Sequence, residues 1–408
     1  MNFQAAVKYL LGLGHETLAI KLGLRNTELL LAALDNPQRA FPSVQIAGTN
    51  GKGSTAVMLD SICRAAGIKS GLYTSPHLVS ITERVKVSGV EITPEDFAAC
   101  ATVVREVSEQ LEALPTFFEQ VTAIALLGFR NAHVELAILE TGLGGRLDST
   151  TAANARLVGI ISIAFDHEEY LGYTIESIAA EKAAIIRPGV RAVIARQHET
   201  AALDVLLKRC EQVGVTPILA DSNANDGLVL GLRGEHQRDN AAVAIALAEL
   251  LKTEGFAITD SAIVTGLKNA QHAGRLEFIP HQPSFLIDGA HNPAGARSLR
   301  NYLDQLITRP LTLVFGAMRD KQLEQMGEIL FPVADTLVLT TIDNPRSASI
   351  DMLQTIAGRF AKGTVLASES STEALRMALA NTPPEGLICI AGSLYLVGEV
   401  RPLILAGV

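Results

Sequence analysis

The chain has 408 residues and a formal net charge of −9 at pH 7, from 34 Lys and Arg against 43 Asp and Glu. Apolar residues make up 48% and charged residues 19%, which excludes a disordered or low-complexity chain. The acidic balance argues against a protein whose main task is to grip nucleic acid, although local cations can still bind a small anion. At about 150 residues per domain, the length predicts two to three domains.

The cysteines and the N-terminus indicate the compartment. Cys63, Cys100, Cys210 and Cys389 are far apart, so the sequence contains no CxxC metal or redox pair. Residues 1–21 lack a basic segment followed by an apolar core and a cleavage site, and no run of 18 apolar residues occurs. We therefore expect a reduced, cytoplasmic protein with no membrane span. We also expect a monomer whose partners are small molecules and not nucleic acid.

Short apolar runs alternate with helix-length segments along most of the chain. Strands are expected at 43–48, 134–141, 158–163, 191–196, 216–220, 285–288, 311–315, 336–341, 364–367 and 386–391, and helices at 54–66, 175–186, 240–251 and 293–306. Several of the strands are continuous Val, Ile and Leu runs, which is typical of strands covered on both faces. This alternation predicts an α/β protein with mostly parallel, doubly wound sheets. The polar, Pro-containing stretch 279–284 predicts a boundary between domains 1–280 and 284–408.

The strongest local motif follows the first expected strand, where a loop with three glycines leads into an apolar helix. Its backbone N–H groups can face phosphate oxygens, Lys52 can reach the terminal phosphates, and Ser54 or Thr55 can offer a hydroxyl to magnesium. The common pattern GxxxxGK[ST] is not matched, because Gly53 lies between Lys52 and Ser54. The simpler alternative is a glycine turn capped by Ser54. The expected nucleotide contacts are Gly48, Thr49, Asn50, Gly51, Lys52, Gly53 and Ser54.

Three charged candidates lie at strand ends, where open α/β sheets bind their ligands: Glu140, His167 and Asp288. Taken alone, Glu140 could equally be a solvated loop acid and His167 a structural histidine. Lys182 lies in an expected helix rich in Ala and Ile, and its simplest interpretation is a lysine that snorkels to water.

Each of the remaining candidates also has an interpretation that involves no ligand. Asn240 would cap the helix that it begins. Arg84 and Lys86 follow His77 in a loop expected to be flexible, where they would either steer an anionic substrate or be merely solvated. Phe117 and Phe118 would usually belong to a helix core, although aromatic faces also stack on flat ligands.

The string GTNGKGS at 48–54 resembles the phosphate loop of the Mur ligase superfamily of ATP-dependent, amide-forming ligases, and within it the dihydrofolate synthase/folylpolyglutamate synthase family. Further matching strings in family order are YTSPH at 73–77, ETGLGGRLD at 140–148, DH at 166–167, LG at 171–172, EKA at 181–183, GRLE at 274–277, DGAHNP at 288–293, GAM at 316–318 and GSLY at 392–395. The resemblance implies an N-terminal Mur-ligase-type P-loop ATPase domain with a mostly parallel sheet, and a smaller Rossmann-like C-terminal α/β domain.

The same resemblance implies roles for individual residues. Ser54, Glu140 and His167 would hold magnesium, and a carbamylated Lys182 would help to hold a second ion. Asn240 would contact adenine, Arg275 the ATP phosphates and Asp288 the nucleotide, with His291 near the reacting phosphate. The catalytic residues would be Lys52, Lys182 and His291, and the pterin would contact Phe117, Phe118, Glu119, Leu147, Asp148 and Ser149.

The implied reaction adds L-glutamate to dihydropteroate, to a reduced folyl(poly)glutamate, or to both. It uses ATP and two magnesium ions, and it passes through an acyl phosphate. Arg346 and Ser347 are candidates for the glutamate site. A Mur-type ligase acting on a peptidoglycan precursor is an alternative that fits the strings GLGGRLD and TSPH less well. A non-catalytic ATP-binding module and a GTPase- or kinase-like protein are the alternatives from other classes.

Overall fold

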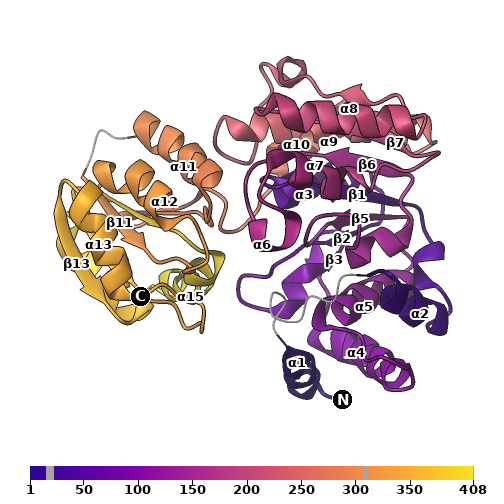
Figure 1. The fold of residues 1–408 in the computed structure, drawn as a ribbon, viewed down its shortest axis with the longest axis horizontal. Coiled ribbons are helices and arrows are strands. Elements are labelled where there is room, and N and C mark those ends of the chain that lie inside the picture. The colour runs from indigo at the N-terminus through magenta and orange to yellow at the C-terminus, as the bar shows by residue number, and fades with distance from the viewer. Residues whose placement is uncertain (15–22, 307–309, 408) are drawn as a thin grey trace. The chain divides into compact units, whose positions relative to one another are not determined.

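The computed structural model describes residues 1–14, 23–306 and 310–407 (Figure 1). These residues form two compact units, each of which contains one β-sheet. Unit 1 comprises Met1–Gly231 and Arg238–Gln271, and unit 2 comprises Leu232–Gln237 and His272–Val408. The chain therefore enters unit 2 before the stretch 279–284 that the sequence singled out, because the strand Glu277–Ile279 pairs with the first strand of the second sheet.

The sheet of unit 1 has eight strands in the order β4-β3-β2-β5-β1-β6-β7-β8. Their bounds are β1 Ser43–Ala47, β2 Ser70–Tyr73, β3 Val85–Val87, β4 Val90–Glu91, β5 Leu136–Glu140, β6 Leu157–Ile160, β7 Arg191–Ile194 and β8 Ile218–Leu219. The pairs β2–β3 and β3–β4 are antiparallel, and all other pairs are parallel. The central strands β1, β5 and β6 are buried along their whole length, which explains the apolar runs 136–139 in β5 and 157–160 in β6. In β1 the buried Gln45 interrupts the run and donates to Thr151 at 2.7 Å.

Helices cover both faces of this sheet. The helices of unit 1 are α1 Phe3–Gly12, α2 Arg25–Ala33, α3 Lys52–Ala65, α4 Pro94–Ser108, α5 Phe117–Asn131, α6 Glu168–Leu171, α7 Ile175–Ala183, α8 Thr200–Gln212, α9 His236–Thr253 and α10 Asp260–Asn269, with 3-10 turns η1 Pro37–Arg39, η2 Ile81–Arg84, η3 Ser149–Ala153 and η4 Ser222–Asn225. On β6, Val158 and Ile160 belong to the apolar cluster of α7, whereas a side chain at Gly159 would point into α9. Helix α5 shares the α7 face, with α1, α2 and α4 packed around it, and α10 packs on α3.

Unit 2 is a smaller three-layer α/β unit with the strand order β13-β12-β11-β14-β10-β9. Its elements are β9 Glu277–Ile279, β10 Ser284–Ile287, α11 Pro293–Leu306, β11 Leu311–Phe315, α12 Leu323–Leu330, η5 Phe331–Val333, β12 Thr336–Thr340, α13 Ile350–Phe360, β13 Thr364–Ser368, α14 Ser371–Asn381, β14 Leu387–Ala391 and α15 Leu394–Leu405. Only β9 is antiparallel to its neighbour. One face of the sheet forms a core with α11, α12 and α13, and α14 and α15 pack against the sheet as well.

The predicted fold class is confirmed, and every predicted strand has a counterpart. The strands β2, β3, β4 and β9 were not predicted, because they are short and none of them lies in a continuous run of Val, Ile and Leu. Three local interpretations, two of them alternatives to a functional role, were wrong. Helix α3 begins at Lys52, so Ser54 is not its cap, and α9 begins at His236, so Asn240 lies inside it. The expected flexible loop after His77 is instead η2 followed by β3, where pairing with β2 orders the backbone.

In the part of the chain that the structure describes, no helix is both long and apolar enough to cross a membrane. Residues 15–22, which belong to the N-terminal stretch considered for a leader, lie outside the described residues. The four cysteines are buried and unpaired. Burial raises the pKa of Cys100 to about 11, so its thiol stays protonated at neutral pH and is unreactive.

Candidate active site

The predicted site residues of unit 1 gather at the carboxyl edge of its sheet. Residues 48–54 follow β1, Glu140 ends β5, and residues 161–167 follow β6. These three strands are parallel neighbours, with Ile46 paired to Glu140 and Ala47 paired to Ile160. The fold therefore brings together segments that are about a hundred residues apart in the chain, at the edge where α/β proteins bind ligands.

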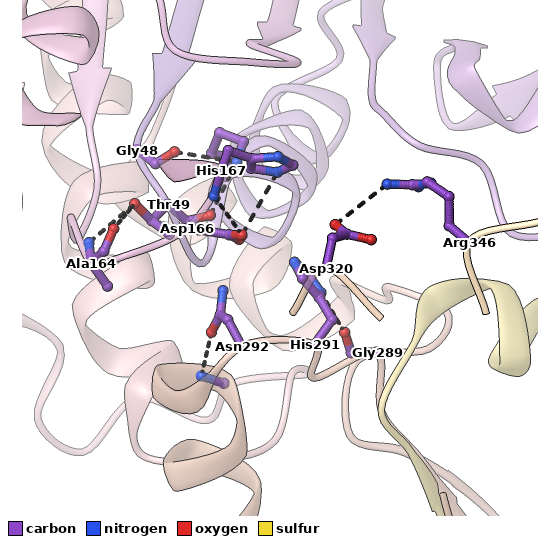
Figure 2. Close-up of polar contacts among 12 residues, drawn as sticks. Gly48, Thr49, Ala164, Asp166, His167, Gly289, His291, Asn292, Asp320 and Arg346 are labelled. Atoms are coloured by element: carbon purple, nitrogen blue, oxygen red, sulfur yellow. Dashed lines mark hydrogen bonds and ion pairs between the residues drawn. The ribbon is translucent and has the colours of Figure 1, made fainter. Parts of the chain in front are cut away.

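The phosphate loop owes its shape to two glycines with positive φ, Gly48 at 145° and Gly51 at 97°. Lys52 is the first residue of α3, and its Nζ donates to the carbonyl oxygens of Gly48 at 3.2 Å and Thr49 at 3.0 Å. The Thr49 hydroxyl donates to the Ala164 carbonyl at 3.0 Å and accepts from the Ala164 N–H at 3.1 Å (Figure 2). The loop is thereby fastened to the segment after β6, in front of the N-terminus of a long helix that favours anions.

Helix α9 lies directly on this loop. A Cβ at Gly51 would overlap the side-chain amide of Asn240, and the Thr55 hydroxyl approaches the Asn240 carbonyl at 3.5 Å. Glycine at position 51 is therefore required both by its backbone conformation and by the space that Asn240 occupies. The expected nucleotide residue Asn240 is thus placed at the loop although it is far away in sequence.

The three expected magnesium residues differ in setting. Ser54 and Glu140 are buried, and Glu140 accepts from the Ser75 N–H at 3.0 Å. His167 precedes α6 in the left-handed region at φ 53°, and its N–H donates to Asp166 at 2.9 Å (Figure 2). Among the described residues, no three His, Cys, Asp or Glu side chains are placed to hold a metal ion. This set fits an ion held largely by nucleotide and water oxygens, as is usual for Mg²⁺, rather than a closed protein cage.

Lys182 is fully inside the protein, and the snorkelling interpretation is therefore wrong. It is only 4% exposed, and its Nζ donates to the Gly48 carbonyl at 2.8 Å. Burial and, to a smaller extent, the nearby Lys52 lower the pKa of Lys182 to about 7, although Asp166, Asp148 and Glu181 partly oppose the shift. Sequence reasoning assigned no role to Asp166. Its carboxylate is buried, lies 3.9 Å from His167 Nε2 and acts electrostatically on Lys182. The sequence did contain a signal for Asp166, because the residue follows a strand and directly precedes the candidate metal ligand His167.

Asp148 shapes the glycine-rich loop after β5. Its carboxylate accepts from the N–H groups of Gly142 at 3.0 Å, Leu143 at 2.9 Å and Thr150 at 3.0 Å, and from the Thr150 hydroxyl. Burial raises the pKa of Asp148, and these hydrogen bonds oppose the shift. Its oxygens are thus committed to the loop backbone, while the neighbouring Leu147 remains half-buried.

The aromatic pair expected at the pterin divides into two roles. Phe117 belongs to the apolar core, which is the structural role that the sequence favoured for it. The half-buried ring of Phe118 covers Gly142, where any Cβ would collide with it, and its centroid lies 6.2 Å from that of Tyr73. Phe118 therefore borders the glycine-rich loop shaped by Asp148.

Glu119 completes a capping box at the start of α5, accepting from the Thr116 N–H at 2.7 Å. Its other oxygen accepts from the Thr27 hydroxyl at 3.3 Å, and the same hydroxyl lies 3.3 Å from Ser149 Oγ. Thr27 is buried and joins two of the expected pterin residues to α2. Sequence reasoning missed Thr27, because a single threonine in a helix carries no local signal.

Arg84 is buried and does not act as a solvent-facing steering charge. Its Nε donates to His77 Nδ1 at 2.7 Å, and its guanidinium carbon lies 5.5 Å from the centroid of Phe117. Since His77 Nδ1 accepts this bond, a neutral His77 carries its proton on Nε2. Lys86 lies in β3 instead.

In unit 2, the segments 274–277 and 288–293 are joined by hydrogen bonds. Asp288 follows β10 and accepts from the N–H groups of Leu276 at 2.8 Å and Ala290 at 2.9 Å. A Cβ at Gly289 would lie 2.9 Å from Nη1 of Arg275. His291 Nδ1 lies 2.8 Å from the Gly289 carbonyl, so that Nδ1 carries a proton (Figure 2). The turn that carries Arg275 and the loop that carries His291 therefore form one bonded assembly.

Glu277 and Arg401 hold that turn from the other side. Arg401 donates to both Glu277 oxygens, with Nη2 at 2.8 Å from Oε1 and Nε at 2.8 Å from Oε2, and the Gly274 N–H donates to Oε2 at 2.8 Å. Burial raises the pKa of Glu277, but the bonds from Arg401 and Gly274 outweigh burial and lower it. The sequence offered no indication that Arg401, on the last helix, reaches this turn.

The two glutamate-site candidates are also engaged within unit 2. Arg346 Nη1 lies 3.5 Å from Asp320 Oδ2 (Figure 2). The Ser347 hydroxyl accepts from the Ile342 N–H at 3.0 Å and donates to the Ala348 carbonyl at 3.1 Å. Ser347 therefore stabilises its own turn. Arg346 is a cation whose side chain is partly exposed.

Comparison with known proteins decides the family. A dihydrofolate synthase/folylpolyglutamate synthase of Bacillus subtilis is 32% identical over 420 aligned residues, which cover 95% of this chain and 96% of that protein. The chain belongs to the dihydrofolate synthase/folylpolyglutamate synthase family. Members of this family are ATP-dependent glutamate ligases, and the predicted family is confirmed.

Within this family, unit 2 carries the second recognisable module. Residues 274–394 match the family model described as Mur ligase, glutamate ligase domain. A probable bifunctional folylpolyglutamate synthase/dihydropteroate synthase of Halobacterium salinarum is 34% identical over 98% of this chain, but the chain spans only 51% of its length. Some members of the synthase family are therefore longer proteins.

Solved structures of the synthase family have the same fold. E. coli FolC in complex with DHPP and ADP is 30% identical, with a TM-score of 0.89 and coverage of 100% of this chain and 98% of that chain. The bifunctional synthase of Yersinia pestis complexed with AMPPNP and Mn ion is 30% identical, with a TM-score of 0.87 and coverage of 99% and 98%. The expected cofactors, ATP and a divalent metal, agree with these bound groups.

Proposed function

We propose that this chain is a ligase that joins L-glutamate to the carboxylate of dihydropteroate, of a reduced folyl(poly)glutamate, or of both. The observation that carries the proposal is the contact of two lysines with one atom. Lys52 and Lys182 both donate to the Gly48 carbonyl, at 3.2 Å and 2.8 Å, in the phosphate loop of a family of ATP-dependent glutamate ligases. Such a loop binds ATP, and the chemistry transfers its γ-phosphoryl group.

The reaction has two steps in this proposal. A carboxylate oxygen of the acceptor attacks the γ-phosphorus, the bond to ADP breaks, and an acyl phosphate forms. The amine of glutamate then attacks the acyl carbon, the carbon–oxygen bond to phosphate breaks, and an amide forms with loss of one proton. Lys52 neutralises negative charge on the transferring phosphoryl group, and we assign Arg275 to the ATP phosphates.

We assign Ser54 and Glu140 to hold a magnesium ion, with His167 beside them. Both of the first two side chains offer oxygen, the ligand that magnesium prefers. A bound magnesium ion would supply positive charge against the phosphate oxygens. We assign Asn240, Asp288 and the loop 48–54 to the nucleotide, and His291 to the reacting phosphate.

The buried amine of Lys182 suits carbamylation. The reaction joins a neutral amine to carbon dioxide and releases one proton, so the lysine becomes an anion. A lysine with an ordinary pKa is almost fully protonated at neutral pH, whereas a pKa of about 7 leaves much of Lys182 in the reactive neutral form. The resulting carbamate is a further candidate ligand for a second magnesium ion.

The acceptor side of the proposed site is the region around the glycine-rich loop. Phe118 and Tyr73 offer aromatic faces for a flat pterin, and Ser149 and Glu119 lie next to the same loop through Thr27. Phe117, Leu147 and Asp148 support these residues. The proposed enzyme works in the cytoplasm as a monomer, because one chain supplies all the assigned residues and its cysteines are free thiols.

The test is an ADP-release assay with ATP and magnesium. We expect ADP only when L-glutamate and a pterin or folate acceptor are both present, and mass spectrometry should find the acceptor extended by one glutamate. Separate assays with dihydropteroate and tetrahydrofolate distinguish one activity from two. A peptidoglycan precursor used as acceptor would favour the Mur-type alternative. ADP release independent of any acceptor, or none with each of them, would contradict the ligase proposal.

A further inference from the structure

A polar pocket lies in unit 1, at the edge of the sheet opposite the phosphate loop. It has a volume of about 310 Å³ and is lined by residues that include Gln38 and Arg39 of η1, Ser43 at the start of β1, and Asn154 and Arg156 before β6. Strand β1 leads from Ser43 to the loop at Gly48, and five residues of strand span about 16 Å. The pocket is therefore separate from the candidate active site.

The pocket is positively charged although the chain as a whole is acidic. Arg39 and Arg156 are both exposed, and their side chains make no hydrogen bond or ion pair within the described residues. None of the lining residues carries a carboxylate. Two unpaired guanidinium groups at one pocket can bind a planar carboxylate or a phosphate through paired hydrogen bonds.

The pocket also contains polar groups that favour a ligand with a hydrogen-bond donor. The Oε1 atom of Gln38 is buried and accepts no hydrogen bond in the described structure, while its Nε2 donates to Asn36 at 3.2 Å. Asn154 adopts the left-handed conformation, and its Oδ1 accepts from Arg187 at 2.7 Å. Buried acceptors are normally satisfied, so this oxygen gains a hydrogen bond when the Gln38 side chain turns toward a donor in the pocket.

We propose that this pocket binds a small phosphate or carboxylate that also carries a hydroxyl or amine donor. The anion would contact Arg39 and Arg156, and the donor would bond to Gln38 Oε1 once that side chain has turned toward the pocket. The pocket is also lined by Ala152 and Ala153 of η3, the turn whose first residues follow Asp148. Binding would therefore stabilise η3 from its far end. The proposal is independent of the proposed ligase reaction.

The test measures binding of glycerol 3-phosphate and of inorganic phosphate to the full chain by calorimetry at constant ionic strength. The first probe carries the phosphate and a hydroxyl, so we expect it to bind at least fivefold more tightly than the second. The double variant R39Q/R156Q should lose at least tenfold in affinity. Its thermal unfolding should not change, because the two side chains make no internal bonds.

Two controls separate this pocket from the phosphate loop and from general charge. The variant R105Q/R376Q removes two exposed arginines elsewhere and should bind the probe normally. The variant K52A alters the phosphate loop and should also bind normally. No binding to the native chain, unchanged binding to R39Q/R156Q, or loss of binding in either control would overturn the proposal. Equal affinity for the two probes would overturn the assignment of Gln38 Oε1.

Discussion

The Nζ atom of Lys182 donates a hydrogen bond of 2.8 Å to the carbonyl oxygen of Gly48, 134 positions away in the chain. Helix α7 brings the lysine to the phosphate loop, where its side chain is buried. Burial lowers the pKa of Lys182 to about 7. The contact therefore couples the shape of the loop to the protonation state of one amine.

This coupling predicts a pH-dependent stability. Between pH 7 and about 10.5, Lys182 is largely neutral in the native state and protonated in the unfolded state, so the unfolded state binds more protons. The free energy of unfolding should therefore rise with pH in this window, by at most about 1.4 kcal/mol per pH unit from this group. The variant K182M should lack that contribution.

Urea unfolding at pH 7.5 and 9.0, in buffers free of carbon dioxide, measures the difference. K182M should also be inactive, yet at least as stable as the native chain at pH 7.5, because a buried amine is replaced by an apolar side chain of similar size. Parallel stability changes in the two proteins between the two pH values would show that Lys182 is not the titrating group.

Gly51 should tolerate no side chain. It combines φ 97° with direct contact to the Asn240 amide, so G51A should reduce ADP formation by about a hundredfold by displacing α9 or the loop. Gly189 is the matched control. It also has positive φ, at 81°, but a Cβ there would meet nothing within 4 Å.

G189A should cost only about 1 kcal/mol in stability and leave the rate of ADP formation within about twofold. Steady-state kinetics and thermal unfolding of both variants check the prediction. Equal losses of activity would mean that backbone strain alone, and not the contact with Asn240, limits position 51.

Asp148 should matter for stability. D148N keeps the shape of the side chain, but its amide nitrogen cannot accept the hydrogen bonds that the carboxylate takes from Gly142 and Leu143. Leaving these half-buried N–H groups unpaired costs about 1 kcal/mol or somewhat more. D221N is the control, because Asp221 caps the exposed turn η4 and Asn caps equally well.

Urea denaturation should find D148N less stable by about that amount and D221N within about 0.5 kcal/mol of the native chain. The KM for the pterin acceptor should also rise in D148N, since the carboxylate shapes the loop next to Phe118. Unchanged stability in D148N would remove the structural role that its hydrogen bonds indicate.

Arg401 should act on nucleotide binding through the turn that carries Arg275. R401M removes the two-point contact with Glu277 and should raise the KM for ATP about fivefold to tenfold, with kcat changed less than about twofold. R376M removes an exposed pair with Glu373 and should change neither constant.

A double-mutant cycle of R401M with E277Q tests whether the two residues act together. The coupling energy should be about 0.5–3 kcal/mol, because the pair is partly buried and bidentate. Additive effects of the two substitutions would mean that the turn keeps its position without this pair.

Local patterns in the sequence were sufficient for the two sheets and for the edge that carries the site. Strands such as β6 and β14 are buried on both faces, so each is an unbroken apolar run that can be recognised without any partner. The glycines of the phosphate loop were recognisable for a similar reason, since their backbone conformations depend on neighbouring residues. The short strands β2 and β3 lacked such a pattern.

Only the tertiary structure decided which polar side chains face water and which are buried. Arg84 and Lys182 read as solvated cations in sequence, yet Arg84 donates to His77 and Lys182 to Gly48, both out of contact with solvent. Arg401 and Glu277 meet although 124 positions separate them. Burial and pairing depend on which segments fold against each other, and a charge changes its chemistry only after that packing has removed water from around it.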